Sequence, residues 1–524
     1  MSNVESLGRR RGGRLARQQM RAAPLTEDTR SIRPGLDGGR YNPLTEQDIL
    51  KIHEAALTLL ETVGLADAIP SCVELVENAG GKLDSDGRLL FPRALVEDTI
   101  ANAGRHFVLH GQNPVHDMEP WGKKVYFGTA GAAVHVVNPL TGEYPPSQLK
   151  DLYDFARLAD QLDNIHFFQR SVVARDLPDP FEMDFNSCYA SVSGTGKHVG
   201  TSWVAPEQLE ASLEMLHHIA GGEKKWRERP FVSQSNCFVV PPMKFAEDAC
   251  RCLEVAVRGG MPVLLLAAGQ AGATSPAALA GAIAQEVAEV LAGLVYVNLI
   301  VPGHPAIFGT WPFVSDLRTG AMSGGSGEQA LLMAGCAQMA TYYDLSGGVT
   351  AGMADAKLPD IQAGYEKGYN YALVGNSGAN LVYEAFGMHA SLMGCCFETM
   401  VLDNDAVGSV LRTVRGIEVN DETLSVETIA DTCRNGPGHY LGSDQTINLM
   451  QSHYFYPALG DRTSPKEWIE KGRPDIIERA VDRTKKMMAD YYPRHISDEV
   501  DSQIRAKWPV KLPRERMTAG NGDW

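Results

Sequence analysis

The sequence has few cysteines and no long apolar run. Nine cysteines are scattered through 524 residues without a CxxC pair, so reduced thiols are expected and a disulfide framework is not. The most apolar stretch, 287–301, contains Glu289 and Asn298, and a membrane helix needs about eighteen unbroken apolar residues. Three arginines at 9–11 precede no apolar stretch, which argues against a secretory signal. We therefore expect a cytoplasmic protein without membrane contact.

Positive charge is scarce outside the amino terminus. The net charge is −16, and residues 1–40 hold nine arginines and four acids, about +5, which leaves the body near −21. An acidic body repels phosphate backbones, so nucleic acid is excluded as a partner. We predict that residues 1–40 form a flexible or subunit-wrapping arm, and we expect a homo-oligomer.

Several common catalytic motifs are missing. The sequence has no GxSxG elbow, no GxxxxGK[ST] loop and no HExxH, and His439, His453 and the adjacent pair Cys395 and Cys396 lack zinc-ligand spacing. We expect no metal site. The run at 324–327, GGSG, precedes a helical stretch and is compatible with phosphate binding, but a turn followed by a helix cap is the favoured interpretation.

What the chain does have is an alternation of strands and helices. Eight apolar strands are predicted at 125–137, 165–173, 197–204, 231–240, 262–268, 306–313, 347–352 and 380–386, with helical runs between them. Eight such units favour an α/β fold, a (β/α)8 TIM-type barrel at 125–400, over a doubly wound sheet.

Helical segments are predicted on both sides of this barrel. An α-rich amino-terminal segment spans 41–124 and begins at the capping pair Thr45 and Asp48. A carboxyl-terminal helical extension spans 401–513 and contains a helix start at Ser464 with Glu467. The last residues, 514–524, are expected to be a frayed tail.

Aromatic side chains gather near the predicted strand ends, where a barrel places its active site. They include Trp203, Trp311, Phe313 and Phe386. Several ring faces around one pocket suit a cation that cannot donate hydrogen bonds, at about 0.5–2 kcal/mol per contact. Ordinary barrel packing is the alternative for each ring.

Polar groups near the same strand ends are fewer. Asp355 and Lys357 follow the seventh predicted strand, where they either form a loop salt bridge or orient a charged substrate. Glu384 lies in the apolar context LVYEAF, so its carboxylate needs either a cation of the barrel or a cationic ligand.

Four stretches closely resemble the trimethylamine/betaine:corrinoid methyltransferase family. They cover 33–64, 127–167, 353–367 (MADAKLPDIQAGYEK) and 436–462 (GPGHYLGSDQTINLMQSHYFYPALGDR). The resemblance implies a (β/α)8 barrel that moves a methyl group from a methylamine or betaine to a Co(I) corrinoid. That corrinoid belongs to a separate small protein, so no tightly bound cofactor is expected here.

The archaeal trimethylamine enzymes of this family carry pyrrolysine in the barrel. This sequence contains only standard residues, and it reads Thr350-Ala351-Gly352-Met353 before the DAK triplet. The difference favours the branch that resembles glycine betaine and related quaternary amine demethylases.

Under that resemblance, each candidate residue receives a hypothetical role. The four aromatic residues named above would form the walls around the cation, and Glu384 or Asp355 would balance its charge. The candidates for binding a substrate carboxylate are His135, Arg170, His198, Gln270 and Lys357. Two other functions stay open: a metal-dependent corrinoid methyltransferase with another substrate, and a non-catalytic quaternary-amine-binding protein.

Overall fold

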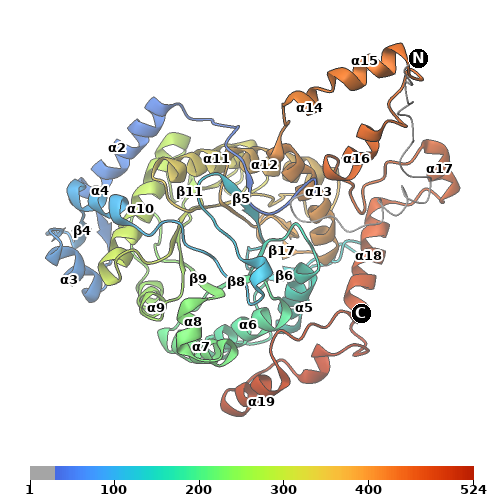
Figure 1. Ribbon diagram of the computed structural model, residues 1–524. Helices are drawn as coiled ribbons and strands as arrows, with labels where there is room; N and C mark the ends of the chain where they lie inside the picture. Colours follow the sequence, from blue (N-terminus) through green and yellow to red (C-terminus); the bar gives the residue numbers. More distant parts are fainter. Residues whose placement is uncertain (1–29) are drawn as a thin grey trace, which may run out of the picture.

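Eight parallel strands form the centre of the molecule in the computed structural model, which describes residues 30–524 (Figure 1). They are β5 (Lys124–Phe127), β7 (Phe167–Gln169), β8 (His198–Thr201), β9 (Val232–Cys237), β10 (Val263–Ala267), β12 (Ala306–Thr310), β14 (Gly347–Thr350) and β15 (Leu381–Tyr383). Neighbours in the sheet run β5-β15-β14-β12-β10-β9-β8-β7. A parallel bridge between Gly128 and Phe167 joins the two ends, so the sheet closes into a barrel.

A helix follows each barrel strand. These helices are α5 (Leu149–Asp160), α6 (Pro180–Gly194), α7 (Pro206–Ala220), α9 (Glu247–Arg258), α10 (Leu279–Ile300), α11 (Gly327–Tyr342), α12 (Ile361–Ser377) and α13 (Phe397–Arg415), with a short α8 (Glu223–Glu228) after α7. The predicted (β/α)8 barrel is confirmed, and all eight predicted strands are present. The strands are shorter than predicted, because the apolar runs continue into buried loops.

The first predicted strand, 125–137, is in fact two elements. β5 ends at Phe127, and β6 (His135–Val136) belongs to a separate three-stranded sheet with β16 (Met388–His389) and β17 (Gly394–Cys395). A two-stranded sheet of β11 (Gln270–Ala271) and β13 (Phe313–Val314) lies beyond β10 and β12. These two small sheets extend the barrel at the carboxyl ends of its strands, the end that we call the mouth.

Glycines inside the barrel leave room for large rings. A Cβ on Gly128 would lie 2.3 Å from the Phe167 ring, and one on Gly348 would lie 3.0 Å from the Tyr383 ring. Any side chain at these two positions would therefore displace an aromatic residue from the barrel interior.

Predicted helix caps are also present. Thr45 and Asp48 form a capping box at the start of α2 (Glu46–Thr62), and Ser464 with Glu467 forms another at α17 (Pro465–Glu470). The Ser326 side chain accepts a hydrogen bond from the Gln329 backbone N–H at the start of α11. The glycine run at 324–327 is therefore a turn and helix cap, which was the favoured interpretation.

The amino-terminal segment packs beside α10. It contains α2, α3 (Pro70–Asn78), α4 (Arg93–Asn102) and a three-stranded sheet of β2 (Leu65–Ala66), β3 (Lys82–Leu83) and β4 (Arg88–Leu90). Helix α10 is long and apolar enough to cross a membrane by composition, but 89% of its most apolar window is buried inside the protein. It is therefore a core helix. Of the predicted basic arm, residues 1–29 lie outside the described residues, and β1 (Leu36–Asp37) pairs antiparallel with β5.

The carboxyl-terminal region is helical. It contains α14 (Asp421–Leu424), α15 (Val426–Arg434), α16 (Asp444–Ser452), α17, α18 (Ile476–Asp490) and α19 (Asp498–Lys507), and α14 to α17 project from the barrel in Figure 1. At the chain end, the Trp524 indole N–H donates to Asp154 at 2.9 Å, and its ring centroid lies 5.1 Å from that of Phe397. The prediction of a frayed tail is therefore wrong.

Candidate functional site

Three aromatic rings meet inside the barrel: Trp311 and Tyr383 come from the carboxyl ends of their strands, whereas Phe167 begins β7. The Trp311 ring, just after β12, lies 5.1 Å from Tyr383 on β15, and Tyr383 lies 4.8 Å from Phe167 on β7. The Trp311 indole N–H donates to the Gly348 carbonyl at 3.1 Å, which fixes the ring. Each of the three residues is less than 5% exposed. They form a preorganised aromatic cluster next to the barrel mouth.

Glu384 stands beside this cluster without a partner. It follows Tyr383 at the end of β15, is 2% exposed, and has a φ of 60°. A left-handed backbone is strained for glutamate, at about 1–3 kcal/mol, and such strain gathers at functional sites. One carboxyl oxygen has no hydrogen-bond partner, and burial raises the pKa of Glu384 to about 8. At neutral pH the side chain is therefore mostly a neutral acid.

Arg170 follows β7 at the same end of the barrel and is half-buried. Within residues 30–524 its guanidinium makes no hydrogen bond or ion pair, although the charge of Asp184 on α6 attracts it. Burial lowers the pKa of Arg170, and burial raises that of Asp184 to about 6. The Asp184 carboxyl accepts from the Val204 backbone N–H at 2.6 Å. The guanidinium is thus a cation with donors still available to a ligand.

Cys237 ends β9 at the same end of the barrel. Cys237 has an exposed side chain, yet burial, aided by Glu286 and Glu384, raises its thiol pKa to about 12. A neutral thiol of this kind is a poor nucleophile. Nearby, the Gln169 amide donates to the Ser235 hydroxyl inside the barrel. Among the described residues, no three His, Cys, Asp or Glu side chains gather as metal ligands.

Two buried glutamates on α10 hold the loops of the mouth. Glu286 accepts from the backbone of Gly269 and of Trp311, while Glu289 accepts from the Met243 backbone N–H at 2.7 Å. Burial raises both pKa values, to about 7 for Glu289, and the charge of Glu289 raises that of Glu286 further. These residues were not among the predicted site residues. The sequence contains one sign of these two glutamates, since Glu289 interrupts the apolar run 287–301.

Other predicted residues lie near the mouth but in different settings. Gln270 and Phe313 pair on the β11–β13 sheet, and both are partly exposed. The Asp355 carboxylate accepts from Ser323 at 2.8 Å and from Ser391 at 2.7 Å. These contacts brace the loop after β14.

Lys357 does not pair with the Asp355 carboxylate. Its ammonium donates to the Asp355 backbone carbonyl at 2.6 Å, and its side chain is exposed. The salt-bridge alternative is therefore wrong. His135 is part of β6, where one ring nitrogen lies 3.1 Å from the Met393 carbonyl oxygen and the other lies 3.5 Å from Arg175.

Three predicted residues are directed away from the mouth or enclosed. His198 begins β8, so it lies at the amino end of the strand, with its ring nitrogens on the His110 carbonyl and the Ser233 hydroxyl. The Trp203 indole N–H donates to Ser212 on α7 at 2.9 Å, so this ring faces the helical layer. Phe386 is fully buried after β15. These placements correct the prediction for His198 and Trp203, because strand boundaries and side-chain direction decide which end and face a residue occupies.

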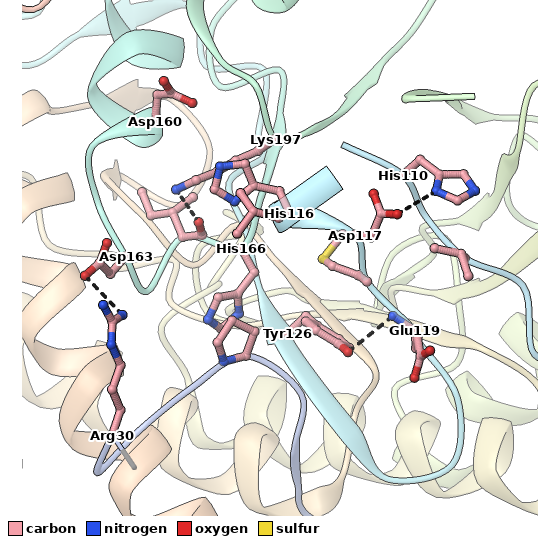
Figure 2. A pocket seen from close by; sticks show the side chains of 15 residues that line it. Arg30, His110, His116, Asp117, Glu119, Tyr126, Asp160, Asp163, His166 and Lys197 are labelled. Carbon is pink, nitrogen blue, oxygen red and sulfur yellow. Dashed lines mark hydrogen bonds and ion pairs between the residues drawn. The ribbon is translucent and has the colours of Figure 1, made fainter. Parts of the chain in front are cut away.

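A cavity of about 570 Å³ opens at the opposite, amino end of the barrel (Figure 2). Lys197 precedes β8 in its wall, and its ammonium donates to the backbone carbonyls of Ala159, Leu162 and Ile165 at 2.6–2.8 Å. Burial lowers the pKa of Lys197 to about 8. All three of its protons are therefore used within the protein.

Asp160, one of four acidic residues in the wall of this cavity, also has its hydrogen-bonding capacity used within the protein. Asp160 accepts from the Thr195 hydroxyl at 2.7 Å, from the Gly196 N–H and the His495 ring at 2.9 Å, and from the Tyr491 hydroxyl. An exception is His166, whose Nε2 has no partner; burial lowers its pKa to about 3, so the ring stays neutral. The cavity is large, but its charges serve the structure.

Comparisons with known proteins found similar sequences along most of the chain. Residues 10–508 match the model of a family described as trimethylamine methyltransferase (MTTB). Trimethylamine methyltransferase MttB of Desulfitobacterium hafniense (strain DSM 10664 / DCB-2) is 30% identical over 88% of this chain and 92% of its own length. The glycine betaine methyltransferase of Desulfitobacterium hafniense (strain Y51) is 29% identical over 89% and 96%. Among solved structures, the Methanosarcina barkeri monomethylamine methyltransferase (MtmB) gives a TM-score of 0.49 at 12% identity, covering 90% of this chain and 92% of that one.

Proposed function

Because the chain belongs to the trimethylamine methyltransferase (MTTB) family, we propose that it takes a methyl group from a quaternary amine, glycine betaine or a related betaine. The acceptor in this proposal is the Co(I) corrinoid of a separate small protein. The absence of any non-standard residue from the sequence favours this donor over trimethylamine.

The observation that carries the proposal is the aromatic cluster beside an unpaired, mostly neutral Glu384. A quaternary ammonium group cannot donate hydrogen bonds, so ring faces are its natural surroundings. A cation bound beside Glu384 would favour the ionised carboxylate and lower its pKa from about 8. The barrel would then supply the counter-charge only when the substrate is present.

Arg170 supports a substrate that also carries a carboxylate. Its guanidinium has no hydrogen bond or ion pair within residues 30–524, and a carboxylate is its best partner because two parallel hydrogen bonds can form. A betaine offers both a trimethylated nitrogen for the rings and a carboxylate for this arginine.

The proposed methyl transfer requires few catalytic side chains from this protein. Removal of a methyl group from a quaternary nitrogen cancels the positive charge and leaves a neutral amine, so no general acid is needed. The nucleophile is supplied by Co(I) when the partner protein is docked. The aromatic rings and Glu384 hold the nitrogen, and the substrate methyl must point to the open end of the barrel.

The rim of the mouth fits the docking of another protein. After seven of the eight barrel strands, the connection or the first turn of the next helix carries a large apolar side chain that is at least half exposed, a common sign of an interaction surface. They are Leu140, Phe181, Val204, Val240, Leu317, Ile361 and Met393. An apolar ring around the mouth is a suitable seat for a corrinoid-bearing partner.

The proposal is tested by incubating the purified protein with free Co(I) cobalamin and a panel of quaternary amines, with trimethylamine as a comparison. The methyl-Co(III) absorbance spectrum should develop with one or more betaines. Affinity for betaine without any methyl-Co(III) product would favour the non-catalytic binding protein, and activity that requires an added metal would favour the metal-dependent enzyme.

Trp311→Ala tests the aromatic cluster itself. We expect betaine affinity to fall about tenfold or more, since one cation–ring contact is worth about 0.5–2 kcal/mol and the cavity left behind adds to the loss. Trp468→Ala on α17, far along the chain from the barrel strands, is the matched control. Unchanged affinity in Trp311→Ala would remove this ring from the cation site.

We also propose that the protein is cytoplasmic, forms a homo-oligomer and holds no tightly bound corrinoid. A cobalamin absorbance band that copurifies with the chain would contradict the last point.

A further inference from the structure

The segment 416–475 contains four helices with almost no buried residues. We call it the arm from here on; it is distinct from the basic amino-terminal segment 1–40. No residue of α14, α16 or α17 is buried, and α15 buries only Thr432. Apolar side chains are nevertheless frequent, and Ile417 is 88% exposed, Leu441 84% and Val419 72%. A group of helices without a core of its own, but rich in exposed apolar side chains, is typical of an interface.

Helix α15 has a continuous apolar stripe that faces outward. Val426 is 69% exposed, Ile429 is 45% exposed, and Cys433 is also exposed. These residues stand at positions i, i+3 and i+7, which lie on one face of a helix. The barrel helices bury such stripes against the sheet, so the stripe of α15 lacks its partner within the described chain.

The arm begins at the amino end of the barrel. The Arg40 guanidinium binds the Val414 carbonyl at the end of α13, and the neighbouring strand β1 pairs with the first residues of β5. The base of the arm is attached, since Arg412 donates to the His453 carbonyl at 2.6 Å. A protein that docks at the carboxyl end of the barrel approaches the end opposite to this attachment.

We propose that the arm is a self-association surface, in which α15 packs antiparallel against α15 of a second copy of this chain. The charges on the helix fit this arrangement. Glu427 lies in the first turn and Arg434 in the last, and neither has an ion pair in the part of the chain that the structure describes. An antiparallel two-fold pair brings each Glu427 close to Arg434 of the second copy.

Aromatic side chains of this segment are also exposed and available to a dimer interface. A standard interface buries about 800 Å² on each partner. A fully buried aromatic side chain contributes about 150–250 Å², and the arm exposes Tyr440, Tyr454 and Tyr456 by 41–63% in addition to its aliphatic residues.

The first test is the mass of the full chain in solution, measured by light scattering during size-exclusion chromatography at about 10 µM. We expect a dimer or a multiple of it, and the Val426→Asp/Ile429→Asp variant should show half the mass with unchanged helix content by circular dichroism. The matched control is Leu317→Asp on the rim of the mouth, which should keep the wild-type mass. A monomeric wild-type protein, or a variant of unchanged mass, would overturn the proposal.

The second test separates a specific antiparallel contact from general stickiness. Glu427→Arg or Arg434→Glu alone puts two like charges in contact in each of the two symmetry-related pairs. We expect the dimer dissociation constant to rise about two- to fivefold for each pair. The double variant should restore the wild-type dissociation constant, as measured by analytical ultracentrifugation. A double variant that associates more weakly than either single one would show that the two residues do not face each other.

Discussion

The two ends of the barrel treat buried charge differently. At the amino end, Asp160 accepts four hydrogen bonds and Lys197 donates three, so nearly every charge in the wall of the large cavity is satisfied by the protein. At the carboxyl end, Glu384 and Arg170 have no such partners. A buried charged group whose hydrogen bonds are all made within the protein stabilises the fold, whereas a buried group without such partners can bind a ligand. The contrast supports our proposal that the substrate binds at the carboxyl end, where Glu384 and Arg170 have hydrogen-bonding capacity left for a ligand.

The largest expected effect tests the structural character of the amino end. Asp160→Ala removes an acceptor shared by four donors, and we expect the free energy of unfolding to fall by about 3–5 kcal/mol. Although burial opposes it, hydrogen bonds from His495, Tyr491 and Thr195 hold the pKa of Asp160 below its ordinary value. Its contribution is therefore present above the unfolded pKa of about 4 and is lost as the pH falls further. Urea denaturation at pH 7 measures the change.

Asp163→Ala is the matched control for this prediction. Asp163 lies three residues after Asp160, which ends α5; its side chain is 83% exposed, and its ion pair with Arg30 spans 3.8 Å. We expect a change below about 0.5 kcal/mol. A loss of betaine turnover in Asp160→Ala at a temperature where the variant is fully folded would show that the amino end is functional, which would break the comparison.

The sequence predicts the barrel well because its strands are buried on both faces and read as apolar runs. All eight predicted strands are present, and the caps at Thr45, Ser326 and Ser464 are where their side chains place them. Two-residue strands are too short for any periodicity to develop, so β6 is merged with β5 in one predicted strand and β11 is missed.

The candidate site is harder to predict than the fold. Residue type pointed to Trp311, Glu384 and Arg170, but it pointed equally to His198, which lies at the amino end of the predicted strand 197–204 and of the observed β8. Residue type also does not show that Trp203 donates to a helix instead of facing the barrel axis. Side-chain direction at strand ends depends on tertiary packing, which leaves no local pattern.

The next effect tests the unpaired acid at the carboxyl end. Glu384→Gln keeps the size of the side chain but cannot ionise, so it cannot balance a bound cation. We expect kcat/KM for glycine betaine to fall about 100-fold, which corresponds to about 2.7 kcal/mol of transition-state stabilisation. Methyl-Co(III) formation with Co(I) cobalamin in excess measures it. An unchanged kcat/KM would show that Glu384 does not serve the substrate.

The same variant should be more stable than the wild type at alkaline pH. The pKa of Glu384 is raised from 4.5 to about 8 by burial, so the folded protein holds a proton that the unfolded chain releases. Wild-type stability therefore falls as the pH rises from about 4.5 to 8, by about 3–5 kcal/mol in total, and Glu384→Gln lacks this loss. Melting temperatures of both proteins at pH 6 and pH 8.5 give the comparison. Parallel pH profiles would contradict the assignment of a protonated Glu384.

A smaller effect concerns the choice of substrate. Arg170→Met should lower kcat/KM for glycine betaine about 10- to 30-fold, because a carboxylate loses charged hydrogen bonds worth about 1.5–3 kcal/mol. It should leave turnover of choline, a quaternary amine without a carboxylate, nearly unchanged or improved. Arg175→Met, which changes another arginine beside the mouth, is the control. An equal loss for both substrates would mean that Arg170 only supports the fold.

The smallest effect is expected at Lys357, a candidate that looked equal to Arg170 in the sequence. Its ammonium donates to the Asp355 carbonyl and its side chain is exposed. Water can replace that contact at little cost, so Lys357→Ala should change kcat/KM less than about twofold. Asp355→Ala differs, since its carboxylate joins Ser323 to Ser391, and a loss of about tenfold is expected from a loosened loop. If Lys357→Ala instead matches Arg170→Met in its selective loss of betaine turnover, the substrate carboxylate lies over the loop after β14. The unpaired guanidinium after β7 would then no longer define the site.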